Sequence, residues 1–163
     1  MHRKPLIGIP AGRRLLGDHY FHCVGGKYVV IRTAWLYSQF GNNFMKTMLR
    51  LASERDSISV VNDQIGTPTH TVDLARAIAT IIKSGKTDYG VYHFSNEGVA
   101  SWYDFAKKIF ELNNVSIDLK PIPTRAFPTP AKRPEYSVLD KSKIKRTFGV
   151  SVPDWEDSLK KTV

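Results

Sequence analysis

The sequence predicts an α/β fold, and three observations support this prediction. The chain has 163 residues, of which 42% are hydrophobic, so it can form the core of one ordinary domain. From Tyr28 onward, short β-branched runs alternate with segments whose apolar residues recur at helical spacing. No internal repeat or low-complexity tract interrupts this alternation. We therefore expect parallel strands that are covered by helices.

The first part of the chain has a different pattern. Residues 1–27 are rich in glycine and show neither helical nor strand periodicity. This change places a boundary near residue 27. We expect an atypical N-terminal segment over 1–27 and the main unit over 28–163.

The first strand and helix are expected between residues 28 and 52. Residues 28–37 begin as a continuous β-branched run, which is typical of a parallel strand buried on both faces, and its carboxyl end should face a ligand crevice. Asn42 or Asn43 can cap the helix that follows. Its apolar positions at helical spacing are Phe44, Met45, Met48, Leu49 and Ala52.

A strand, a loop and a second helix follow. Residues 58–61 predict a short strand, and Gly66 and Pro68 indicate that 62–69 is a loop. Thr71 is the expected N-cap of the next helix, which Gly85 ends. The residues expected to point inward from this helix are Val72, Ala75, Ile78, Ala79 and Ile82.

The remaining elements are expected after residue 90. Residues 90–94 predict a strand, and Ser101–Asp104 form a capping box that opens a helix. Pro121 indicates that 117–122 is an edge strand. Two short helices, over 141–148 and 154–161, complete the chain. The buried stripe of the capped helix is Trp102, Phe105, Ala106, Ile109 and Phe110.

The charge of +9 is concentrated in two stretches, residues 1–27 and residues 120–147. Solvated surface accounts for such stretches, and an anionic small ligand explains the second stretch equally well. Only the charge favours nucleic acid, so we do not expect nucleic-acid binding. We also expect no membrane span and no secretion signal. A single cysteine, Cys23, suits a cytoplasmic protein.

Five motifs occur in order: Arg32–Ser38, Gly41–Phe44, Asp63–Thr69, Asp73–Ala75 and Arg133–Asp140. With these motifs the sequence, from about Tyr28 to Val163, resembles the C-terminal part of dTDP-4-dehydrorhamnose reductases. The resemblance implies a Rossmann-type extended short-chain dehydrogenase/reductase, with a Rossmann domain for the nicotinamide cofactor and a small substrate-binding lobe. It also implies that residues 28–163 are the sugar-nucleotide-binding part.

The family reaction is the reduction of a 4-keto sugar nucleotide by NADPH or NADH, giving dTDP-L-rhamnose. This chemistry needs a glycine-rich turn for the cofactor and a Tyr-x-x-x-Lys pair to protonate the alkoxide. The sequence contains neither; Ile9 and Arg13 stand near the positions of the tyrosine and lysine. We therefore expect no catalytic residue and no activity from this chain alone. Tyr37 lacks the lysine that would lower its pKa.

The resemblance also leaves a second function open. The regulatory subunit of methionine adenosyltransferase resembles the same reductases but acts by association, and the missing Tyr-x-x-x-Lys pair agrees with such a role. A sheet without its preceding strands would also favour oligomers, so a homo-oligomer is possible. Isolated histidines and one cysteine make no metal-ligand spacing, so we expect no metal site.

Six residues are the candidates for contact with a dTDP-sugar. The resemblance places Trp35 beside the hexulose ring, where an indole can stack on a deoxysugar; core packing is the alternative. Arg133 can bind the diphosphate with its planar guanidinium, or be a solvated loop charge. Asn43 can bind the nucleotide or only cap its helix. By resemblance the loop that contains Gln64, Gly66 and Pro68 borders the cleft, and Gly66 would allow backbone to approach the ligand.

Overall fold

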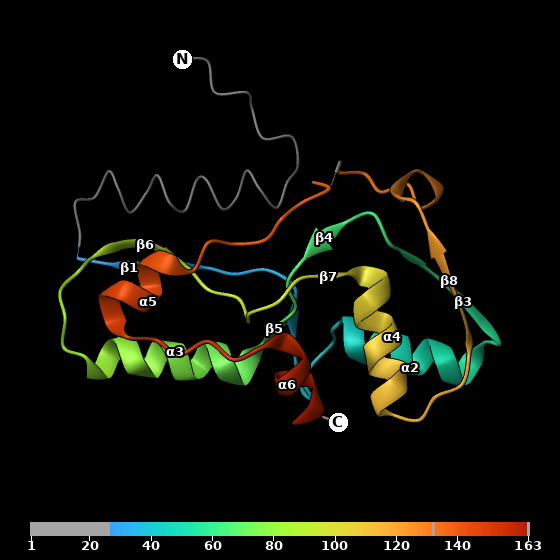
Figure 1. The fold of residues 1–163 in the computed structure, drawn as a ribbon, viewed down its shortest axis with the longest axis horizontal. Helices are drawn as coiled ribbons and strands as arrows, with labels where there is room; N and C mark the ends of the chain where they lie inside the picture. Colours follow the sequence, from blue (N-terminus) through green and yellow to red (C-terminus); the bar gives the residue numbers. More distant parts are fainter. Residues whose placement is uncertain (1–26, 132, 163) are drawn as a thin grey trace, which may run out of the picture.

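The computed structural model describes residues 27–131 and 133–162 and shows an elongated arrangement of helices and short strands (Figure 1). Strands β1 (Val29–Arg32) and β6 (Gly90–His93) lie at one end, with helices α3 (Thr71–Lys83) and α5 (Ser142–Phe148) beside them. At the other end lie strands β3 (Ser57–Val61) and β8 (Asp118–Ile122) and helices α2 (Phe44–Glu54) and α4 (Trp102–Leu112). The expected alternation of strands and helices is therefore present.

The first end is built on a parallel strand pair. β1 and β6 pair in register from Val29 opposite Gly90 to Arg32 opposite His93. Helix α5 ends at Gly149, which adopts a left-handed conformation with φ 66°. Glycine reaches this conformation without the steric cost of a Cβ atom. The buried apolar residues of this end are Ala77, Ile81, Tyr92, Phe94, Ile144, Phe148 and Val150.

The second end contains β3 (Ser57–Val61) and β8 (Asp118–Ile122), which are also parallel, with α2 (Phe44–Glu54) and α4 (Trp102–Leu112) packed against them. Asn43 is the N-cap of α2. The capping box of α4 is present, because the Ser101 and Asp104 side chains each bond to the other residue's backbone N–H. The expected stripe of α4 is buried in this end of the core, with Trp102 half-buried at its edge.

Short elements connect the two ends. β2 (Leu36–Tyr37) pairs in parallel with β5 (Thr69–His70), and β4 (Ile65–Gly66) pairs antiparallel with β7 (Ala100–Ser101). Helix α6 (Trp155–Lys160) begins at its N-cap Asp154, as the sequence predicts. The candidate site residues lie in this middle region and in the loops beside it.

Three local expectations were wrong. Residues 62–69 are not wholly loop, since β4 and β5 form there by pairing with segments distant in sequence. The N-cap of α3 is His70, and Thr71 is already helical. The strand expected over 28–37 is split into β1 and β2, because Trp35 between them has φ 52°, which is outside the strand region.

The inward face of α3 was also predicted incorrectly. The buried positions are Asp73, Ala77 and Ile81, whereas Ile78 is 40% exposed and Ile82 is 74% exposed. The polar residues of the helix, Asp73, Arg76, Thr80 and Lys83, recur on one face, yet Asp73 among them is buried, so the buried face is not the face opposite the polar residues. A contact made by a polar residue, Asp73, sets the orientation instead, as described below.

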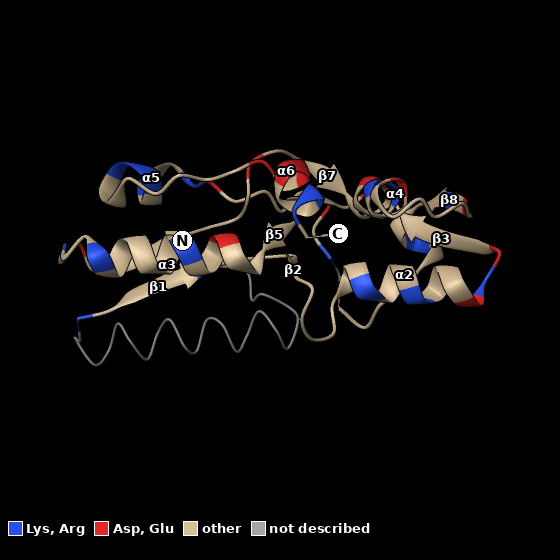
Figure 2. Ribbon diagram, turned by 90° about the horizontal axis from the view of Figure 1, so that it is seen from below, with Lys and Arg blue, Asp and Glu red and all other residues tan. Residues whose placement is uncertain are grey.

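Lys and Arg residues occur on several elements, including α2, α3 and α5, and acidic residues occur on α4 and α6 (Figure 2). Within residues 27–131 and 133–162, no helix has both the length and the apolar character needed to span a membrane.

Candidate functional site

Trp35 lies at the centre of the candidate site. Its indole is stacked on Trp102 of α4, with ring centroids 3.6 Å apart and planes 14° from parallel. Trp102 in turn contacts Phe44 at the start of α2, 4.7 Å between centroids. One aromatic face of Trp35 is therefore covered by protein, while the residue stays only half-buried. Its indole N–H has no hydrogen-bond partner among the described residues, so it can donate to a ligand.

Gly66 brings the 62–68 segment against this indole. A Cβ atom at Gly66 would lie 2.7 Å from the Cε2 and Cζ2 atoms of Trp35 and 2.9 Å from the Oγ atom of Ser137. Only a residue without a side chain allows this approach. Pro68 is fully buried two residues later. The structure thus brings Trp35, Gly66 and Ser137 together.

The basic, proline-rich stretch runs beside the same segment. Ile65 donates a backbone hydrogen bond to the Glu135 carbonyl (2.7 Å) and accepts one from the Ser137 N–H (2.8 Å). Gln64 donates from its side-chain amide to the Thr124 hydroxyl (3.0 Å). Gln64 therefore joins two loops. Arg133 is two residues from Glu135 and is exposed, and no described residue forms a hydrogen bond or ion pair with its guanidinium.

Asn43 has its side-chain amide engaged within the protein. Its Nδ2 atom donates to the carbonyls of Ser38 (2.7 Å) and Phe40 (3.2 Å), and its Oδ1 atom accepts from the Lys46 N–H (3.2 Å). These bonds agree with the capping alternative. They also position Phe44, the next residue, against Trp102.

The Tyr37 hydroxyl is not accessible to a ligand and is not positioned to transfer a proton to one. The residue is fully buried, and its hydroxyl donates to the Trp155 carbonyl. Burial raises the pKa of Tyr37, and the carboxylates of Asp73 and Asp154 raise it further. Ile9 and Arg13, which stand near the positions of the family's tyrosine and lysine, lie outside the described residues.

A buried polar network next to the site was missed by sequence reasoning. The Asp73 carboxylate accepts hydrogen bonds from Ser158 (2.6 Å) and from Asn96 (2.9 Å), and Asn96 also accepts one from the His70 N–H (2.8 Å). Burial alone would raise the pKa of Asp73, but these hydrogen bonds and the nearby charges of His70 and Arg76 hold it below its usual value. Asp73 was quoted only as part of a motif, and nothing in that motif indicates Asn96 or Ser158 as its partners.

Two other residues of the region were missed as well. Trp102 was assigned only to the core stripe, although its ring stacks on the indole of Trp35. Asp63 was quoted only as part of a motif, yet its carboxylate bonds to Thr124. No local pattern pairs residues so distant in the sequence.

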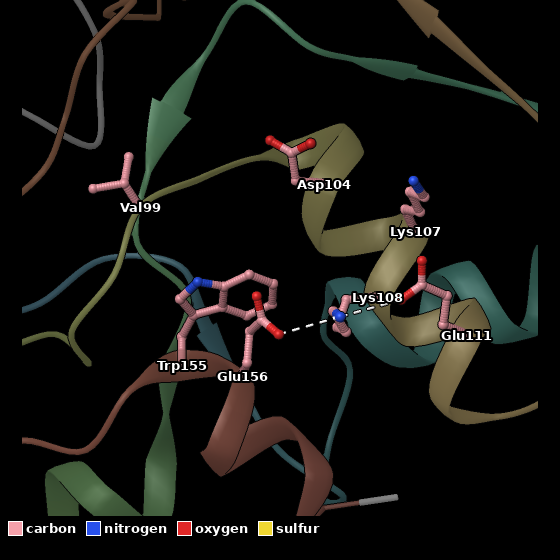
Figure 3. Close-up of a pocket in the computed structure, with 7 residues that line it drawn as sticks. All are labelled: Val99, Asp104, Lys107, Lys108, Glu111, Trp155 and Glu156. Carbon is pink, nitrogen blue, oxygen red and sulfur yellow. Dashed lines mark ion pairs between the residues drawn. The ribbon is translucent and has the colours of Figure 1, made fainter.

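A separate pocket of about 280 Å³ lies between α4 and the start of α6 (Figure 3). Lys108 there forms ion pairs with Glu111 and Glu156, both at 3.2 Å, so its charge is balanced by protein. None of the six candidate residues lines this pocket. Its lining residues are Val99, Asp104, Lys107, Lys108, Glu111, Trp155 and Glu156. Across residues 27–131 and 133–162, no three His, Cys, Asp or Glu side chains are grouped closely enough to hold a metal ion.

Comparison with known proteins identifies the chain's relatives. The family model of the RmlD substrate binding domain matches residues 8–163. This range begins within residues 1–27, the segment that the sequence analysis separated from the main unit. The chain is 43% identical over 155 residues to a dTDP-4-dehydrorhamnose reductase of Aggregatibacter actinomycetemcomitans, which covers 88% of this chain and 52% of that protein. The chain thus spans about half the length of such relatives.

Solved structures of proteins from the same group of reductases are also similar to this chain. A dTDP-4-dehydrorhamnose reductase of Bacillus anthracis in complex with NADP matches 99% of this chain and 56% of its own, with a TM-score of 0.89 and 40% identity. An ortholog from Clostridium acetobutylicum matches the same shares with a TM-score of 0.91 and 41% identity. They confirm the predicted fold class, the C-terminal portion of a Rossmann-type extended reductase. From the family model and these relatives we conclude that the chain belongs to the family of the RmlD substrate binding domain.

Proposed function

We propose that this chain is the sugar-nucleotide-binding part of a dTDP-4-dehydrorhamnose reductase and that its ligand is a dTDP-sugar. The observation that carries the proposal is the meeting of Trp35, Gly66 and the Arg133 loop at one place. An aromatic surface can stack on a deoxysugar, and the exposed guanidinium of Arg133, two residues before Glu135, can bind a diphosphate.

Each candidate residue has a role in this proposal. Trp35 offers its half-buried indole and its free N–H to the sugar. Arg133 binds the diphosphate oxygens in pairs. Gly66 and Pro68 shape the backbone beside the indole. Gln64 and Asn43 act through the protein, by joining two loops and by fixing the start of α2.

The reduction itself needs hydride from NADPH or NADH and a proton donor. A glycine-rich turn at a helix N-terminus, which binds the diphosphate of such a cofactor, does not occur in the part of the chain that the structure describes. The described residues therefore do not fit the cofactor, and we assign them the binding of substrate alone. Turnover by the chain alone is not expected. The cytoplasm is the expected location.

Calorimetric titration of the 163-residue chain with dTDP tests the proposal. We expect saturable binding that Arg133→Ala weakens about tenfold or more, because a charged hydrogen-bond donor to phosphate is lost. Lys83→Ala is the matched control, since Lys83 is an exposed cation in the last turn of α3. The affinity of this variant for dTDP should equal that of the parent chain. Equal loss in both variants, or no heat at millimolar dTDP, would contradict the proposal.

A regulatory role through association remains the second hypothesis. Size-exclusion chromatography with and without dTDP separates the two. A regulatory protein should bind a partner protein whether or not nucleotide is present, and a homo-oligomer should form from this chain alone.

A further inference from the structure

The stretch from Thr124 to Glu135, here called the 124–135 loop, is attached at both ends to one short segment, residues 62–65. At its far end, Ile65 and Glu135 share a backbone hydrogen bond of 2.7 Å. At its near end, the attachment is made by side chains of Asp63 and Gln64. The loop lies between these two attachments.

The near attachment is an Asp63–Thr124 clamp. The Thr124 N–H donates to both carboxylate oxygens of Asp63, each at 2.9 Å, and the Thr124 hydroxyl donates to Oδ1 at 2.6 Å. The same hydroxyl accepts from the Gln64 amide at 3.0 Å. The hydrogen bonds from Thr124, together with the charge of Arg125, hold the pKa of Asp63 below its usual value. The carboxylate is therefore ionised at neutral pH and can accept all three bonds.

The strand register explains how the clamp forms. β3 and β8 are parallel and end together, with Val61 opposite Ile122. Asn62 then donates a backbone hydrogen bond to the Ile122 carbonyl at 3.0 Å. Asp63 follows Asn62 directly, and Thr124 follows Ile122 after Pro123, so both lie just beyond the same edge, where the short 3₁₀ helix η1 (Thr124–Ala126) begins.

The clamp fixes the entrance to a loop that contains Arg125 and Arg133. Three prolines, Pro128, Pro130 and Pro134, restrict the backbone within it. A loop that is closed at both ends and restricted inside has less entropy to lose when it binds a ligand. Neither Asp63 nor Thr124 belongs to the buried cores, and the Asp63 side chain is exposed.

We propose that Asp63 is a positioning residue for the sugar nucleotide: by holding Thr124, it keeps the 124–135 loop ordered so that Arg133 is presented to the diphosphate before binding. This inference rests on the proposed function. It assigns Asp63 no contact with the ligand. Its effect reaches the ligand through the loop.

Four variants of the full chain test this inference by dTDP titration. Asp63→Asn replaces an acceptor by an N–H donor facing Thr124, and Thr124→Val removes the hydroxyl at constant shape; each should weaken dTDP binding about tenfold. Thr124→Ser keeps the hydroxyl and should restore nearly the parent affinity. Asp118→Asn is the matched control, because Asp118 is an exposed carboxylate at the other end of β8. It should bind like the parent.

Tryptic cleavage after Arg125 provides a second readout that needs no ligand. We expect faster cleavage in Asp63→Asn and Thr124→Val than in Thr124→Ser or the parent, with thermal unfolding midpoints unchanged. If the parent binds dTDP and the clamp variants bind and cleave like it, the clamp inference is overturned and the proposed function stands. If the parent does not bind dTDP, both are overturned, whatever the cleavage rates.

Discussion

At the scale of single residues, the site depends on close contacts that leave no spare volume. Trp35 contacts both Trp102 and Gly66, and its backbone has a positive φ of 52°, which is uncommon for a bulky residue. Such a conformation persists only where its surroundings enforce it. The indole is therefore held in one orientation before any ligand arrives.

The contact between Gly66 and Trp35 gives a prediction. Gly66→Ala should reduce the free energy of unfolding by about 1–3 kcal/mol, because the new methyl group overlaps the indole. Trp35→Phe in the same chain should recover part of this loss, since the smaller ring leaves room, while dTDP binding stays weak. Denaturant unfolding of the two single variants and the double variant measures the coupling. Strictly additive effects would contradict the contact.

At the scale of elements, α3 shows how a polar residue can orient an apolar helix. Asp73 in its first turn accepts hydrogen bonds from Asn96 and Ser158, which lie on other segments. These bonds turn Ala77 and Ile81 inward and leave Ile78 and Ile82 at the surface. The apolar periodicity of the helix alone would place Ile78 and Ile82 inward, opposite its polar residues.

Two adjacent isoleucines test this orientation. Ile81→Ala should lower the free energy of unfolding by about 2–5 kcal/mol, because it leaves a cavity in the core, whereas Ile82→Ala should change it by less than about 0.5 kcal/mol. Chemical denaturation of both variants at low protein concentration is the measurement. A large effect of Ile82→Ala that grows with protein concentration would show instead that another copy covers this face.

The sequence predicted elements whose causes are local. The capping box at Ser101 and the stripe of α4 were predicted correctly because both depend on residues one or two turns apart. The face of α3, the strands β4 and β5 and the stacking of Trp35 on Trp102 were not predictable in this way. Each depends on a partner distant in the sequence, and no spacing rule specifies that partner.

At the scale of the whole molecule, the buried network joins parts that are far apart in the chain. Asp73 lies in the first turn of α3, Asn96 follows β6 and Ser158 belongs to α6, and all three are nearly inaccessible to solvent. Asn96 also donates to the Pro153 carbonyl at 3.1 Å, which fixes the approach to α6. The network therefore connects the end built on β1 and β6 with the middle of the molecule.

This network predicts a loss of stability in acid. Burial lowers the pKa of His70, although Asp73 opposes the shift, so protonation favours the unfolded chain as the pH falls below about 6.5. The pKa of Asp73 is also lowered, so its contribution is present above its ordinary value of 3.8 and is lost as the pH falls further. Urea unfolding between pH 7 and pH 3 should show both losses.

The variant Asp73→Asn separates the two contributions. It should be less stable at neutral pH by about 1–3 kcal/mol, because buried donors lose their acceptor. It should also lack the further loss below pH 4. A parallel pH dependence in the parent and the variant would show that Asp73 does not titrate as described.

The double attachment of the 124–135 loop has a consequence for how such proteins can diversify. Both ends of the loop are hydrogen-bonded to residues 62–65. The distance between the two ends is therefore set by that segment and not by the loop. Its interior can gain, lose or exchange residues while the same two end points are kept. Under the proposed function, an altered preference for the nucleotide can thus be engineered by replacing residues 126–131 as one unit while Arg133 and both attachments are kept.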